Sequence, residues 1–133
     1  MIRVTSSGQA AQGPALSAAG VYVDGHGSPL VAGIVGRRTM ASNGVITGWS
    51  LLADVAGSVA FEIRKSTYAG YPAKTVISGA TPPALAGQIK ASGDVAGWSD
   101  ITFTRGDVLE FAITGVPATL TQATLSLSLT ETP

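Results

Sequence analysis

Residue types that could perform catalysis are few in this sequence of 133 residues. His26 is its single histidine and lies in a glycine-rich stretch, without the further histidines or cysteines that a zinc site needs. No nucleophile-elbow motif marks partners for a Ser-His-Asp triad, and no glycine-rich phosphate loop is present in the sequence. We interpret His26 as an exposed turn residue and expect no catalytic residue, no metal and no cofactor.

Glu62 and Glu110 are the carboxylates that could form an acid-base pair. Each alternates with large apolar residues, so its side chain is expected to point away from the core, where nothing perturbs its pKa. We interpret both as solvated, or as partners in ion pairs between subunits. The chain is therefore predicted not to be an enzyme, and a carbohydrate-active enzyme on a β-sandwich is the least favoured alternative.

Tyr68 and Tyr71 are the clearest candidates for binding a partner. They lie in one loop that follows the basic pair Arg64-Lys65. An exposed tyrosine can stack on a sugar or anchor a protein interface, although the rings could also fold back over the edge of the domain.

Composition restricts the partners further. Charged residues make up 12% of the chain and the net charge is zero, which favours self-association because little repulsion separates the copies. No basic stripe is present to contact phosphates, so nucleic acid is not expected as a partner. The sequence contains neither a membrane-spanning apolar run nor a secretion signal, and no cysteine, so synthesis in the cytoplasm and no membrane contact are expected.

Period-two alternation predicts that the elements holding these residues are β-strands. It is clearest at residues 58–65, 107–114 and 121–130, whose apolar residues are expected to face one core. Shorter strands are predicted at 21–24, 30–37, 45–53, 75–78, 88–91 and 99–104. Eight or nine short strands without a helical period predict an all-β fold, a jelly-roll-like antiparallel β-sandwich.

The sandwich is predicted to span residues 20–133, preceded by a flexible arm at residues 1–19. The arm is small, polar and interrupted by glycine and proline. Its large apolar side chains are Ile2, Val4 and Leu16, which we expect to anchor it on a neighbouring subunit.

Several motifs occur in an order that resembles a domain of tailed-bacteriophage virion proteins. A G-W-S-L-L-A-D run at residues 48–54 precedes an alternating strand that ends in a basic pair. A T-Y-A-x-Y/F-P loop follows at residues 67–72, then a proline-containing crossover and a G-W-x-x-x-I segment at residues 97–101. A G-D-x-L-x-F segment at residues 106–111 precedes the closing strand. Order and spacing match over about residues 24–133.

This resemblance implies a β-sandwich of a capsid surface or a tail-fibre tip, commonly a trimer, without catalytic residues. Because the chain is almost entirely sandwich, the favoured function is a capsid decoration or cement protein that binds the major capsid protein within the virion. The alternative is a separately encoded tail-fibre or receptor-binding tip, for which a glycan of the host surface is a possible ligand.

Overall fold

The computed structural model describes residues 15–132. This part of the chain forms strands and no helix: β1 (Ala15–Asp24), β2 (Gly33–Thr39), β3 (Asn43–Ser66), β4 (Thr75–Val76), β5 (Ala84–Gly93), β6 (Thr102–Phe103), β7 (Val108–Ala118) and β8 (Gln122–Thr132). Every pair of neighbouring strands is antiparallel. The predicted all-β fold is confirmed.

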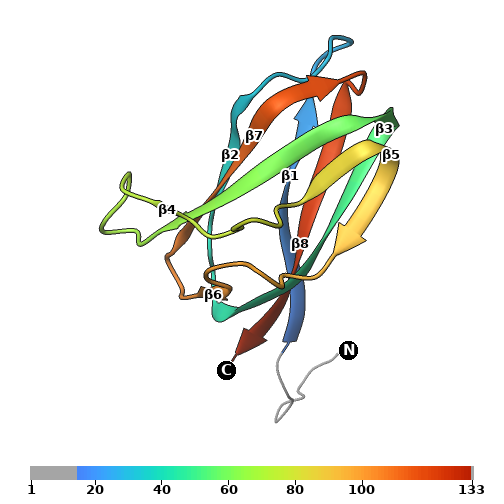
Figure 1. Ribbon diagram of the computed structural model, residues 1–133. Helices are drawn as coiled ribbons and strands as arrows, with labels where there is room; N and C mark the ends of the chain where they lie inside the picture. The colour runs from blue at the N-terminus through green and yellow to red at the C-terminus, as the bar shows by residue number, and fades with distance from the viewer. Residues whose placement is uncertain (1–14, 133) are drawn as a thin grey trace, which may run out of the picture.

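The strands form two layers that share β3 and β5 (Figure 1). The first part of β3 pairs with β8 and the second part with β7, while β5 pairs with both parts. One layer therefore has the order β1-β8-β3-β5, and the other has the order β2-β7-β3-β5 with β4 beside the end of β3. This is the order of a jelly-roll sandwich in which two long strands each pass through both layers.

The predicted strands at 45–53 and 58–65 are joined in the structure. They belong to β3, which is 24 residues long, and residues 54–57 form a bend rather than a break. The bend appears in the pairing with β5 as a shift of register between Leu52 and Gly57. Asp54 and Gly57 are turn-forming residues, and at this bend β3 turns from the layer of β8 into the layer of β7 while the strand pairing with β5 resumes on the other side (Figure 1).

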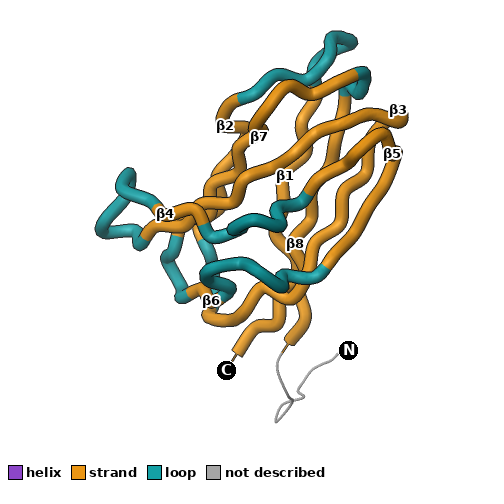
Figure 2. The backbone as a smooth tube through the Cα atoms, in the orientation of Figure 1, coloured by secondary structure: helices purple, strands orange, loops and turns teal. Residues whose placement is uncertain are grey.

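The core lies between the layers, and the three clearest predicted strands face it as expected. Their inward-pointing residues are buried: Val59, Phe61 and Ile63 in β3, Leu109, Phe111 and Ile113 in β7, and Ala123, Leu125, Leu127 and Leu129 in β8. Trp98 also packs against this cluster, and its Nε1 donates to the carbonyl oxygen of Thr81 at 3.0 Å. That bond joins the two connections that flank β5, which run side by side in Figure 2.

Strand β1 begins at Ala15, five residues before the predicted boundary between arm and sandwich. Ala15 pairs with Glu131, so the start of β1 lies beside the end of β8. Leu16, one of the predicted arm anchors, is therefore part of β1 and pairs with Thr130. The remaining arm, with Ile2 and Val4, lies outside the described residues.

Candidate binding site

The outward-facing side of β7 is covered, although alternation predicts that it faces solvent. Val108, Glu110 and Ala112 point away from the core, yet all three are buried. The loop at residues 67–74, between β3 and β4, projects beside this strand (Figure 1). Long side chains from this loop and from the neighbouring strands close over β7.

Glu110 lies at the centre of this cover, with a side chain that is 2% exposed. It is opposite Arg37 of β2 on one side and opposite Arg64 of β3 on the other. Its carboxylate accepts hydrogen bonds from Arg37 Nε at 3.0 Å, from Arg64 Nη1 at 2.8 Å and from Lys74 Nζ at 2.9 Å. The Arg64 Nε also donates to Glu62 at 2.7 Å, so three cations and two carboxylates form one cluster.

The cluster changes the acidity of Glu110. Burial raises the pKa, but the hydrogen bonds from Lys74, Arg64 and Arg37 lower it by more, and the result is a pKa of about 2. The prediction that Glu110 is solvated with an unperturbed pKa is therefore wrong. Alternation correctly placed the carboxylate on the outer face, but it contains no information on which long side chains of other strands cover that face.

The loop at residues 67–74 is held by its own hydrogen bonds. Thr67 organises it, because its hydroxyl accepts from the Gly70 amide at 2.9 Å and its carbonyl accepts from the Tyr71 amide at 3.0 Å. Lys74 then fixes the end of the loop to Glu110. The guanidinium carbon of Arg37 lies 5.9 Å from the centre of the Tyr71 ring, within the range of a cation–π contact.

A pocket of about 400 Å³ opens between this loop and β2, lined by Arg37, Thr39, Tyr68, Tyr71 and Val108. Both tyrosines that the sequence singled out thus line one pocket. Arg37 and Thr39 were not predicted. Their positions at and just after the end of a predicted strand are visible in the sequence. They indicate a place beside the pocket only when the pairing of β2 with β7 is known.

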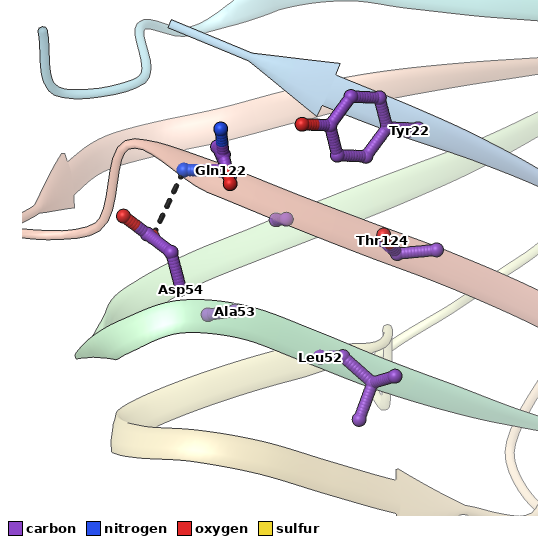
Figure 3. A pocket seen from close by; sticks show the side chains of 7 residues that line it. Tyr22, Leu52, Ala53, Asp54, Gln122 and Thr124 are labelled. Carbon is purple, nitrogen blue, oxygen red and sulfur yellow. Dashed lines mark hydrogen bonds between the residues drawn. The ribbon is translucent and has the colours of Figure 1, made fainter. Parts of the chain in front are cut away.

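A second, smaller pocket of about 170 Å³ lies on the other layer, around Asp54 (Figure 3). The Asp54 carboxylate accepts from the Thr121 hydroxyl at 2.6 Å and from the amides of Thr121 and Gln122 at 3.0 Å each. These bonds, the Thr121 hydroxyl first, lower the pKa of Asp54 to about 2. Because its oxygens are occupied in tying the β3 bend to β8, we assign Asp54 a structural role.

The middle of the outer face of the β1-β8-β3-β5 layer consists mainly of small and uncharged residues. Paired residues form two rows across it: Gly20, Ser126, Ser50 and Ser92 in one, and Tyr22, Thr124, Leu52 and Lys90 in the other. Lys90 is the single charged residue in these rows. Tyr22 and Leu52 are 58% and 57% exposed and lie on either side of Thr124 (Figure 3). We call this surface the neutral face.

The other residues considered for chemistry take structural positions. His26 is exposed in a turn, as expected, and its amide donates to Asp24 at 2.8 Å. Among residues 15–132, no group of His, Cys, Asp and Glu side chains is arranged to hold a metal ion. Within the same range, no helix is long and apolar enough to cross a membrane.

Comparison with known proteins identifies no family. No protein-family model and no curated protein matches the sequence. Among solved structures, a chain described as "Cyanophage Pam1 capsid asymmetric unit" aligns over 99% of this chain and 94% of its own length, at 12% identity and a TM-score of 0.41. The assignment of the fold rests on strand order and not on this alignment.

Proposed function

We propose that this protein is a structural component of a tailed-bacteriophage virion and that it decorates the capsid shell. The observation that carries the proposal is the position of the motifs behind the family resemblance. The loop at 67–72 covers β7, Gly106 adopts a left-handed φ of 92° in the turn before β7, and Trp98 packs into the core. The motif residues thus take structural positions in the sandwich that the resemblance implies. This supports a relationship in fold between this chain and the phage virion domain.

The neutral face supports a role in assembly. A decoration protein must cover part of a shell. The neutral face has one charge and two exposed apolar side chains, so burying it against a partner carries a low desolvation cost. We assign this face to contact with the capsid or with a neighbouring copy.

A receptor-binding tip is the second candidate, because of the pocket beside Tyr68 and Tyr71. Exposed aromatic rings next to a guanidinium are features of ligand sites, and a shell contact does not require them.

We also propose that the protein has no catalytic activity. Glu110 is the one fully buried carboxylate among residues 15–132, and it has three cationic partners and a pKa of about 2. At neutral pH such a carboxyl group is ionised, so it cannot act as a general acid. Its oxygens are engaged by cations and its pKa is low, so it is also a weak general base. Turnover of bacterial polysaccharides that a single substitution abolishes would contradict this proposal.

The test of decoration is binding to capsids of the encoding phage that were assembled without this protein. Leu52→Lys places a charge in the middle of the neutral face and is expected to weaken capsid binding by at least about tenfold. Deletion of residues 2–14 removes Ile2 and Val4 without shortening β1 and is also expected to weaken it.

Val116→Lys is the matched control, because Val116 is 92% exposed on the other layer. It should bind capsids as the unchanged protein does. If instead the protein binds host cells, and Tyr68→Ala with Tyr71→Ala abolishes that binding while capsids are not bound, the receptor-binding function replaces decoration.

A further inference from the structure

We propose that the pocket between β2 and the loop at residues 67–74 binds a saccharide that carries a carboxylate. The pocket is formed by β2, β7 and this loop, whereas the neutral face belongs to β1, β8, β3 and β5. The site thus goes beyond capsid decoration and does not depend on it.

Arg37 is the residue that recognises the carboxylate. Its Nε donates to the buried Glu110 at 3.0 Å, and its guanidinium lies against the ring of Tyr71. These two contacts fix the plane of the guanidinium, and among residues 15–132 no second acceptor satisfies its terminal nitrogens. Those nitrogens carry the remaining donors of the group, and a guanidinium held in one orientation is suited to grip both oxygens of a carboxylate.

Charge in the surrounding cluster favours an anion. Arg37, Arg64 and Lys74 contribute three positive charges against the two negative charges of Glu62 and Glu110, which leaves one in excess. Arg64 and Lys74 are engaged by the carboxylates. Arg37 is also paired with Glu110, but it is the cation of the cluster that lines the pocket, so the excess positive charge of the cluster acts at the pocket wall.

The tyrosines favour a sugar as the body of the ligand. Tyr68 and Tyr71 are 73% and 38% exposed, so their rings offer faces on which the C–H side of a sugar ring can pack. Their hydroxyl groups and that of Thr39 can exchange hydrogen bonds with sugar hydroxyls. The volume of about 400 Å³ lies within the range of about 300–1,000 Å³ that small-molecule pockets occupy.

The experiment is a titration of the whole protein, followed by amide chemical shifts, with trigalacturonic acid. The same trisaccharide with all carboxylates methyl-esterified is the neutral comparator. We expect the acid to bind with shifts around the pocket and the ester to bind at least about tenfold more weakly, because a charge-assisted bidentate contact is lost.

Two variants and one control identify the site. Tyr68→Ala removes an exposed ring whose side chain makes no hydrogen bond within the described residues, so it should weaken binding without lowering the melting temperature. Arg37→Lys keeps the charge but not the bidentate geometry, and it should reduce the preference for acid over ester. Tyr22→Ala removes another exposed ring, which lies on the neutral face, and should leave binding unchanged.

Equal affinity for acid and ester, absence of binding to either, or loss of binding in Tyr22→Ala would overturn the proposal. A triglutamate peptide is the competitor of a different class, since it offers carboxylates without a sugar ring. If it binds as tightly as trigalacturonic acid, the site is one for acidic peptides and the saccharide assignment is wrong. None of these outcomes depends on capsids, so the pocket and the decoration function are tested separately.

Discussion

At the scale of the residue, Glu110 links three elements that are distant in sequence. Its partners come from β2, from β3 and from the loop before β4. Buried ion pairs often contribute little net stability, because desolvation offsets their attraction. Their geometry is nevertheless demanding, and here it fixes the loop over β7 and the direction of Arg37. Glu110 therefore acts as a positioning residue for the pocket.

Glu110→Gln tests this role. The substitution keeps the size of the side chain but leaves the three cations around it without their main counter-charge. We expect the free energy of unfolding to fall by about 3 kcal/mol, as when one partner of a buried pair is removed. Urea denaturation measures it. Glu62→Gln is the matched control, because Glu62 is partly exposed and bound by one cation, and should cost less than about 1 kcal/mol.

The lowered pKa of Glu110 makes a prediction about acid. The pKa is about 2 in the fold against an ordinary value of 4.5 in the unfolded chain, so the stabilisation is fully present above about pH 4.5. It is lost as the pH falls toward about 2. Plots of the free energy of unfolding against pH should be flatter in this range for Glu110→Gln. The pKa of Asp54 is lowered to about 2 as well, so Asp54→Asn should remove a separate part of the pH dependence of the free energy of unfolding. Identical pH dependences in the unchanged protein and both variants would contradict the lowered pKa values.

At the scale of the element, the bend of β3 decides how the two layers are connected. Asp54 receives hydrogen bonds from Thr121 and Gln122, and the Thr119 hydroxyl donates to the carbonyl oxygen of Ala56 at 2.7 Å. The bend is therefore bonded to the connection between β7 and β8. Gly57 completes the contact, because its backbone approaches that of Ala118 too closely for a side chain.

Gly57→Ala should consequently disturb the corner. The added Cβ would overlap the carbonyl oxygen of Ala118, which is backbone and cannot move without shifting β7. We expect a loss of about 2 kcal/mol in the free energy of unfolding, typical of overpacking. Ala56→Ser, at an exposed neighbour in the same bend, should change it by less than about 0.5 kcal/mol. A Gly57→Ala protein as stable as Ala56→Ser would show that the corner is looser than the structure indicates.

At the scale of the whole molecule, low charge and the neutral face point to self-association. Charged residues make up 12% of the chain and its net charge is zero, so copies do not repel one another. Light scattering at micromolar concentration is expected to give a mass several times 13.3 kDa, with a trimer as the predicted state. A monomer that stays monomeric on assembled capsids would contradict this prediction.

Local sequence patterns were sufficient to assign the three clearest β-strand segments and their inward faces. Phe61, Phe111 and Leu125 could be assigned to the core because alternation is a local property of the chain: successive side chains of a strand point to opposite sides. Tyr68 and Tyr71 could be assigned to one exposed loop for a similar reason, because a loop is recognised from its own residues.

The tertiary structure alone decided which strands are neighbours, and with them the candidate site. Arg37, Arg64 and Lys74 meet Glu110 across sequence separations of 73, 46 and 36 residues. Such contacts depend on the register between strands, which no local pattern specifies when several strands share the same alternation. For the same reason the sequence divided β3 into two strands, because the pairing with β5 that carries it through the bend is a long-range contact.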